Sequence, residues 1–143
     1  MTDTNTMTAA PEALQARATL AESANDHVVL AIPSTDYRIR LTVDAQPDNE
    51  VGKRIRGLVR AQARRIDVVS TGGRYIEPVY GRPRRIQGTI LSVDAAADTV
   101  TIAPHDAFPF VCRTSESQRA AQFKPGQFVA CDLVTAAAFT PVS

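Results

Sequence analysis

The sequence predicts an all-β protein, a small barrel of about seven to nine short strands with a short N-terminal helix or tail. Valine and isoleucine together far outnumber leucine, and every valine and isoleucine lies at or after Val28. β-branched side chains lose rotamer freedom in helices and pack well on pleated sheets. Turn-forming residues also recur at short intervals after Val28, as is typical of barrels and sandwiches.

Residues 1–26 differ in composition and are expected to form a flexible tail or a marginal helix, with residues 27–143 as a single β-barrel domain. The segment from Pro11 to Asp26 is alanine-rich, and Pro11 suits the first position of a helix. Leu14, Ala18 and Ala21 would share one thin apolar face, and isolated helices of this length are marginal in water. A helix that docks on the barrel or on a partner is the alternative, and residues 1–9 are expected to be disordered.

The strands after Asp26 are predicted from β-branched runs that are separated by turn residues. Turns are indicated at Pro33–Asp36, Gln46–Asn49, Gly72–Gly73, Gly81–Pro83 and Pro125–Gly126. The expected strands are 27–32, 37–43, 52–62, 65–69, 74–80, 85–93, 98–103, 108–113 and 127–135. One further helical turn or two is expected within Ser115–Gln122.

Alternating side chains support the hairpin formed by residues 85–93 and 98–103. Ile86 and Ile90 share one face of the first strand, and Val100 and Ile102 share one face of the second. The loop 94–98 between them is short. We therefore expect one apolar face of this hairpin to point inward.

Two separate segments, Arg54–Val59 and Arg85–Ile90, share the pattern Arg-Ile-polar-Gly-x-(Val/Ile). Glycine inside a strand often marks a bulge, a barrel corner or the close approach of another backbone. The similarity is either an internal repeat or a coincidence between two short β patterns. With the chain length and strand count, two strongly bent strands favour a small barrel of the oligonucleotide-binding (OB) type.

Motifs for catalysis, metals or phosphate loops are missing from the sequence. His27 and His105 stand apart from other metal ligands, and a zinc site needs about four. Cys112 and Cys131 fall in expected strands, where buried small hydrophobic side chains are the simplest interpretation. Gly72-Gly73 lacks the Lys-Ser/Thr of a phosphate-binding loop. We expect no enzyme activity, no metal and no cofactor, although catalytic groups that converge only in space would escape this reasoning.

The expected location is cytoplasmic and away from membranes. No apolar run approaches the roughly 20 residues needed to cross a bilayer. The N-terminal segment, positions 1–20, lacks the basic start and apolar middle of a signal peptide.

Charge is distributed unevenly along the chain, although the formal net charge is only +1. Residues 1–52 carry 3 basic and 8 acidic side chains, or −5, and residues 86–143 carry 3 against 5, or −2. Residues 53–85 carry 10 basic side chains against Asp67 and Glu77, or +8. The small net charge therefore excludes only a uniformly basic protein.

The basic segment predicts an arginine-rich strand face. Alternation would place the even positions from Arg54 to Arg64 on one face, opposite Ile55, Gly57, Val59, Ala61 and Ala63, with a bulge or bend at Arg64-Arg65. Tyr75 and Tyr80, expected in the next strand, would add stacking surfaces for bases, because OB-type barrels hold single strands in this way. The candidate nucleic-acid-binding residues are Arg54, Arg56, Arg60, Arg64, Arg74, Arg84, Arg85, Tyr75 and Tyr80.

Three interpretations of this face remain open. The arginines bind RNA, single-stranded DNA or another anionic polymer; they form a protein interface or a self-assembling surface; or they are solvated, or pair within the fold with acids such as Asp36, Asp44, Asp48 and Glu50. Arginines also protect exposed sheet edges from aggregation. A small hydrolase or ligand-binding barrel would require a deep pocket with converging polar groups.

Overall fold

The computed structural model describes residues 12–134 and 136–142, and within them the chain is mostly β-strand. The all-β prediction is confirmed, although the strands of the described part number eleven rather than seven to nine. The elements are η1 (Glu12–Leu14), β1 (Ala16–Ser23), β2 (His27–Ala31), β3 (Arg38–Thr42), β4 (Arg54–Val68), β5 (Tyr75–Glu77), β6 (Tyr80–Gly81), β7 (Arg85–Asp94), β8 (Thr99–Ala103), β9 (Phe110–Arg113), η2 (Ala120–Gln122), β10 (Phe128–Leu133) and β11 (Ala138–Pro141).

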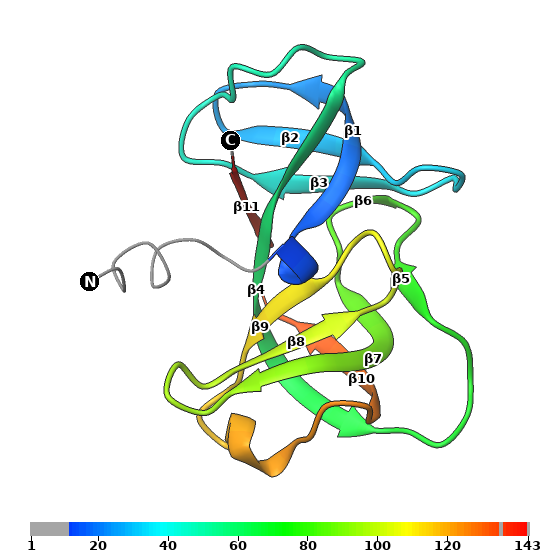
Figure 1. Cartoon of the computed structure of the whole chain (residues 1–143), viewed down its shortest axis with the longest axis vertical. Helices are drawn as coiled ribbons and strands as arrows, with labels where there is room; N and C mark the ends of the chain where they lie inside the picture. Colours follow the sequence, from blue (N-terminus) through cyan, green and yellow to red (C-terminus); the bar gives the residue numbers. More distant parts are fainter. Residues whose placement is uncertain (1–11, 135, 143) are drawn as a thin grey trace.

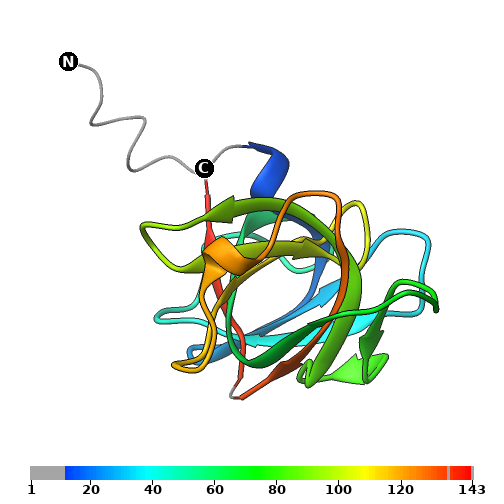
Figure 2. The same cartoon turned by 90° about the horizontal axis from the view of Figure 1, so that it is seen from below.

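The long strand β4 runs through both halves of the molecule and belongs to two closed circuits of paired strands (Figure 1). The first circuit follows the order β1–β2–β3–β11–β4 and returns to β1. The second follows β4–β10–β7–β8–β9 and returns to β4. Seen from below, the second circuit wraps into a ring (Figure 2). The N-terminal half of β4 serves one circuit and its C-terminal half serves the other.

The two circuits repeat one strand order. In each, three strands form an antiparallel meander, β1–β2–β3 or β7–β8–β9, and a fourth strand, β4 or β10, returns antiparallel to the first. The fifth strand lies parallel to the third: β11 beside β3 in the first circuit, β4 beside β9 in the second. The fourth strand of the first circuit is therefore also the fifth strand of the second.

The same turn introduces the returning strand in both circuits. Gly52 and Gly126, at φ +92° and +93°, each donate a backbone hydrogen bond to the meander's first strand, at Leu20 and Ile90. The carbonyl of the following residue, Lys53 or Gln127, accepts a hydrogen bond from the backbone N–H of the same first-strand residue, Leu20 or Ile90. Both first strands shift register against the second strand just after these positions. The two halves are therefore structurally equivalent in detail.

The shared Arg-Ile-polar-Gly pattern does not follow this equivalence, because β4 is the fourth strand of its circuit whereas β7 is a first strand. The two glycines of the pattern nevertheless have the same structural role. A Cβ atom on Gly57 would collide with the backbone oxygen of Thr140, and one on Gly88 with the backbone oxygen of Ala103. The expected close approach of another backbone is confirmed at both glycines, while the duplication lies in topology rather than in this motif.

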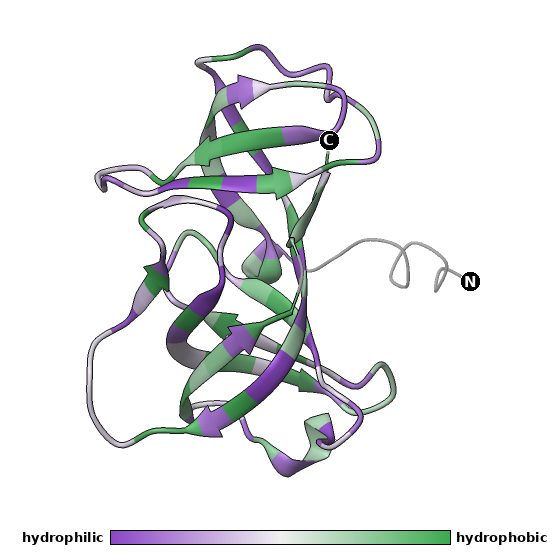
Figure 3. Cartoon of the chain, turned by 180° about the vertical axis from the view of Figure 1, so that it is seen from behind, coloured by the Kyte–Doolittle hydropathy of each residue, from purple (hydrophilic) through white to green (hydrophobic). Residues whose placement is uncertain are grey.

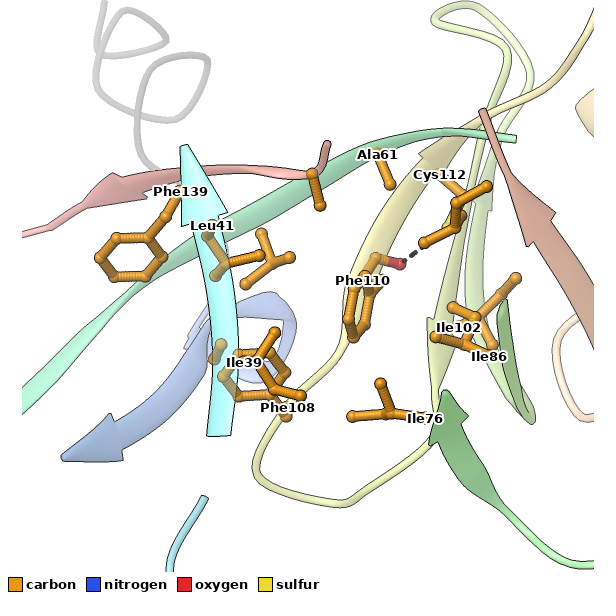
Figure 4. Close-up of a cluster of buried hydrophobic side chains, with 14 of the residues drawn as sticks. Ile39, Leu41, Ala61, Ile76, Ile86, Ile102, Phe108, Phe110, Cys112 and Phe139 are labelled. Carbon is orange, nitrogen blue, oxygen red and sulfur yellow. Dashed lines mark hydrogen bonds between the residues drawn. The ribbon is translucent and has the colours of Figure 1, made fainter. Parts of the chain in front are cut away.

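One continuous hydrophobic core fills both circuits (Figure 4). Phe108 and Phe110, both fully buried, meet edge to face with ring centroids 5.6 Å apart. Cys112 and Cys131 are also fully buried and free, as expected for small hydrophobic side chains. The neighbouring Cys131 thiol and burial raise the pKa of the Cys112 thiol well above its ordinary value, so it stays protonated.

The expected N-terminal helix is wrong for most of its length. Only Glu12–Leu14 is helical, and Ala16–Ser23 forms β1, which pairs with both β2 and β4. Ala16, Ala18 and Leu20 are buried, while Arg17 between them points outward. Small alanines fit the interior of a tight ring, so tertiary pairing overrides their helical propensity. The predicted disorder of residues 1–9 lies outside the described residues.

One further expectation, the single strand at residues 74–80, needs correction. Residues 74–80 form two short strands rather than one, interrupted at Pro78, and these pair with different neighbours: β5 with β7, and β6 with β3. The helical turn expected within Ser115–Gln122 is present as the single turn η2. The closing strand β11 was not expected, because its four residues carry little β signal and gain their place from pairing with β3 and β4.

Hydrogen bonds accepted by Asp98 connect η2 to the β7–β8 turn. Its negative charge is expected to stabilise the fold most at neutral pH. Its carboxylate accepts hydrogen bonds from the Ala120 N–H at 2.7 Å and from Arg119 at 3.3 Å. These bonds, with the Ala120 N–H dominant, lower the pKa of Asp98 below the ordinary aspartate value. A lowered carboxyl pKa gives stability that is complete above about pH 4 and is lost as pH falls through the folded-state value.

The variant Asp98→Asn keeps an acceptor and tolerates the left-handed backbone at φ 58° but removes the charge. We expect it to be modestly less stable than the parent at pH 7 and equally stable near pH 2, measured by urea unfolding across this range. A difference that grows toward acid pH would contradict this role.

Candidate nucleic-acid interface

The alternation predicted for β4 is confirmed. Ile55, Gly57, Val59, Ala61 and Ala63 are buried, whereas Arg54, Arg56, Arg60 and Arg64 are exposed. Seen from behind, β4 carries alternating hydrophilic and hydrophobic bands (Figure 3). The predicted break is also present: Leu133 pairs with Ala63 and Asp132 with Arg65, so Arg64 is the extra residue of a bulge.

Strand pairing adds two arginines that sequence reasoning missed. Arg17 of β1 lies directly opposite Arg56, and Arg113 of β9 lies directly opposite Gln62. Both are exposed. Neither residue falls in the basic segment, and only the register of distant strands places them there. We name Arg17, Arg54, Arg56, Arg60, Arg64 and Arg113 the arginine row.

Three members of the row gather at one groove. Arg17, Arg54 and Arg56 line a groove of about 590 Å³, together with Asn49 and several apolar residues, and the described lining residues include no carboxylate. Like charges directly opposite one another on a sheet destabilise it. Glu12 offers partial relief, at 3.7 Å from Arg56, although its side chain is 82% exposed. The groove is therefore a concentrated positive site.

The rest of the row continues along β4. Arg60 donates to the neutral Thr140 hydroxyl at 2.8 Å and forms no ion pair with another described residue. Arg64 and Arg113 line a second depression that also contains Arg119, with Asp98 and Glu116. Among the described residues, the Arg64 and Arg113 side chains form no hydrogen bond or ion pair.

Two other candidates, Arg74 and Arg85, are paired within the fold and lie off the row. Arg74 contacts Asp106 at 2.6 Å. Arg85 donates to the Tyr75 hydroxyl at 3.0 Å and contacts Asp132 at 2.6 Å, and these two bonds raise its pKa above its ordinary value. β10 separates β7 from β4, so Arg85 faces Asp132 rather than the row.

Internal pairing also involves Arg65, which meets Asp67 at 2.7 Å. In the described chain the partners of these arginines are thus Asp67, Asp106 and Asp132. The acids that the sequence suggested instead, Asp36, Asp44, Asp48 and Glu50, form no ion pair in the same part of the chain.

Tyr75 and Tyr80 do not share one strand, contrary to expectation, and neither lies in a strand that pairs with β4. Tyr75 is on β5, which pairs with β7, so two strands separate it from β4, or about 14 Å. Tyr80 is on β6 beside β3, where its side chain is 67% exposed. Arg84 is also exposed, but it lies in the segment after β6 and not on the arginine row. The predicted placement of both tyrosines in one strand is wrong because the segment divides at Pro78 between two sheet edges.

Comparison with known proteins gives no relative from which a function could be transferred: no family model, no curated protein and no solved structure matches this chain. Within residues 12–134 and 136–142, no three His, Cys, Asp or Glu side chains gather in a way that could hold a metal ion. The helices in these ranges are too short to cross a membrane.

Proposed function

We propose that this protein is a non-enzymatic binding module that holds single-stranded nucleic acid through its phosphates, which lie along the arginine row. The first strand circuit, a meander with a returning fourth strand and a fifth parallel to the third, supports an OB-like barrel. OB-like barrels commonly bind oligonucleotides, but fold alone does not fix function. The arginine row supplies the specific argument.

The observation that carries the proposal is the groove of Arg17, Arg54 and Arg56. Three guanidinium groups share one face, two of them directly opposite one another, and none of the described residues that line the groove is acidic. A phosphate placed in the groove would contact more than one guanidinium group, and guanidinium forks match its oxygens.

The length of the row favours a polymer over a small anion. Arg54 and Arg64 are ten positions apart on one strand, or about 34 Å at the rise of an extended chain. Arg60 and Arg113 lie between them in the register. An extended chain of phosphates contacts such a row at several points, and the affinities of these contacts combine.

The test is a fluorescence anisotropy titration of a labelled thymidine oligonucleotide at about 50 mM salt. Replacing Arg54 and Arg56 together by Gln is expected to weaken binding on the order of tenfold, because two phosphate contacts are lost. The matched control is Arg74→Gln, which removes an exposed arginine already paired with Asp106. Parent protein that does not bind, or equal weakening by both variants, would refute the proposal.

A second candidate function, self-assembly, is favoured by one feature. Asp44 and Asp48 line a separate depression beside β11 whose described lining residues include no basic side chain, and this acidic surface of one copy would complement the row of another. Light scattering distinguishes the two. If the parent and the Arg54→Gln/Arg56→Gln variant are both monomeric at high concentration, self-assembly is excluded. If the parent is a dimer and the variant is a monomer, self-assembly is supported.

A further inference from the structure

Tyr80 forms an exposed aromatic surface on the first strand circuit. It belongs to the two-residue strand β6, which lies parallel to β3, with Tyr80 paired to Arg38. Its side chain is 67% exposed, the highest value among the exposed large hydrophobic residues. No hydrogen bond or ring contact to another described residue engages its side chain. An aromatic ring this exposed is free to stack on a planar ligand.

Positive charge surrounds this ring. Arg38 lies beside it on β3, and Arg40 lies two positions further along the same face. Arg82 and Arg84, both exposed, follow β6 directly. Arg38, Arg82 and Arg84 form no side-chain contact with a carboxylate in the described chain. Arg40 lies near Asp26, whose carboxylate already accepts a hydrogen bond from His27 at 2.8 Å.

Strand register connects this surface to the groove. Reading across the sheet, Arg54 pairs with Thr19, Thr19 with Ala31, Ala31 with Arg38, and Arg38 with Tyr80. Residues directly opposite one another share a face of a sheet, so this line runs along the outside of the first circuit. Measured along the curved sheet, four strand spacings amount to about 19 Å. Between the two arginines lie the half-buried Thr19 and the buried Ala31, which is 8% exposed.

We propose that Tyr80 stacks on a base of a single-stranded nucleic acid whose phosphates bind Arg38 and the groove of Arg17, Arg54 and Arg56. The inference rests on the proposed function and adds to it a preference for unpaired bases over phosphate chains. Stacking on an aromatic side chain requires a base face that a duplex conceals. The bound strand therefore crosses β1, β2 and β3 rather than following β4 alone.

The experiment compares two probes, a thymidine oligonucleotide and inorganic polyphosphate of similar charge, on the parent protein, three tyrosine variants and the Arg54→Gln/Arg56→Gln variant. Tyr80→Ala is expected to weaken oligonucleotide binding roughly five- to a hundredfold, as for removal of one stacked base, and to leave polyphosphate binding unchanged. Tyr80→Phe keeps the ring and is expected to bind as the parent does. Tyr75→Phe is the control, because the Tyr75 hydroxyl contacts Arg85 away from this surface.

The outcomes separate the two proposals. Oligonucleotide binding that is intact in Tyr80→Ala but weakened in Arg54→Gln/Arg56→Gln would overturn the stacking inference and leave phosphate binding standing. Equal losses for both probes in Tyr80→Ala would also overturn it, since polyphosphate has no base to stack. A parent protein that binds neither probe would overturn both proposals.

Discussion

Replacing Phe110 by alanine is expected to lower the free energy of unfolding by about 3–5 kcal/mol, the range for removing a buried aromatic side chain. Phe110 is fully buried, lies in β9 against β4 and β8, and packs edge to face on Phe108. Backbone pairing on both sides of β9 restricts collapse around the vacated space, so a cavity would remain. The loss of packing would destabilise both strand circuits because they share one hydrophobic core.

Urea unfolding followed by circular dichroism measures this difference. The control is Leu91→Ala, since Leu91 is 42% exposed at the bulge of β7 and should change stability by about 1 kcal/mol or less. Equal effects of the two substitutions would contradict the packing described for the core.

Replacing Gly88 or Gly57 by alanine is expected to destabilise the protein by about 3 kcal/mol or more, at the upper end of overpacking effects. In each case the new methyl group would meet the backbone of a neighbouring segment, at Ala103 or at Thr140 and Pro141. Backbone atoms cannot rotate away as a flexible side chain does. Relief requires the paired strands to move apart, which breaks their hydrogen bonds.

The control for both is Gly73→Ala. Gly73 has nothing within 4 Å of its hypothetical Cβ and lies in the loop before β5, so its substitution should change stability by no more than about 0.5 kcal/mol. Thermal unfolding of the three variants side by side provides the comparison. A Gly88→Ala protein as stable as Gly73→Ala would show that β7 and the end of β8 do not approach as closely as described.

Local sequence patterns predicted the fold well where the alternation of side chains within a single strand determines which face is buried. The alternation from Arg54 to Ala63 and the bulge at Arg64 follow from side-chain period alone. β1 could not be predicted in this way, because its alanines favour a helix until β2 and β4 offer edges on both sides. β11 likewise depends on partners far away in sequence.

The candidate site was predicted only in part, for the same physical reason. Arg54, Arg56, Arg60 and Arg64 share a face because they lie on one strand. The pairing of Arg85 with Asp132, and the placement of Arg17 opposite Arg56, are set by long-range register. Closeness in the sequence also gave a wrong expectation of closeness in space. Tyr75 and Tyr80 lie close in the chain but on strands that pair with different partners.

The salt dependence of oligonucleotide affinity tests the central claim most directly. Each phosphate contact with a single strand contributes about −0.7 to the slope of log affinity against log salt concentration. We predict a straight line for the parent protein with a slope steeper than about −2, and a slope shallower by about 1.4 for Arg54→Gln/Arg56→Gln. An affinity that does not change with salt, or a slope that is the same in parent and variant, would contradict phosphate binding by the arginine row.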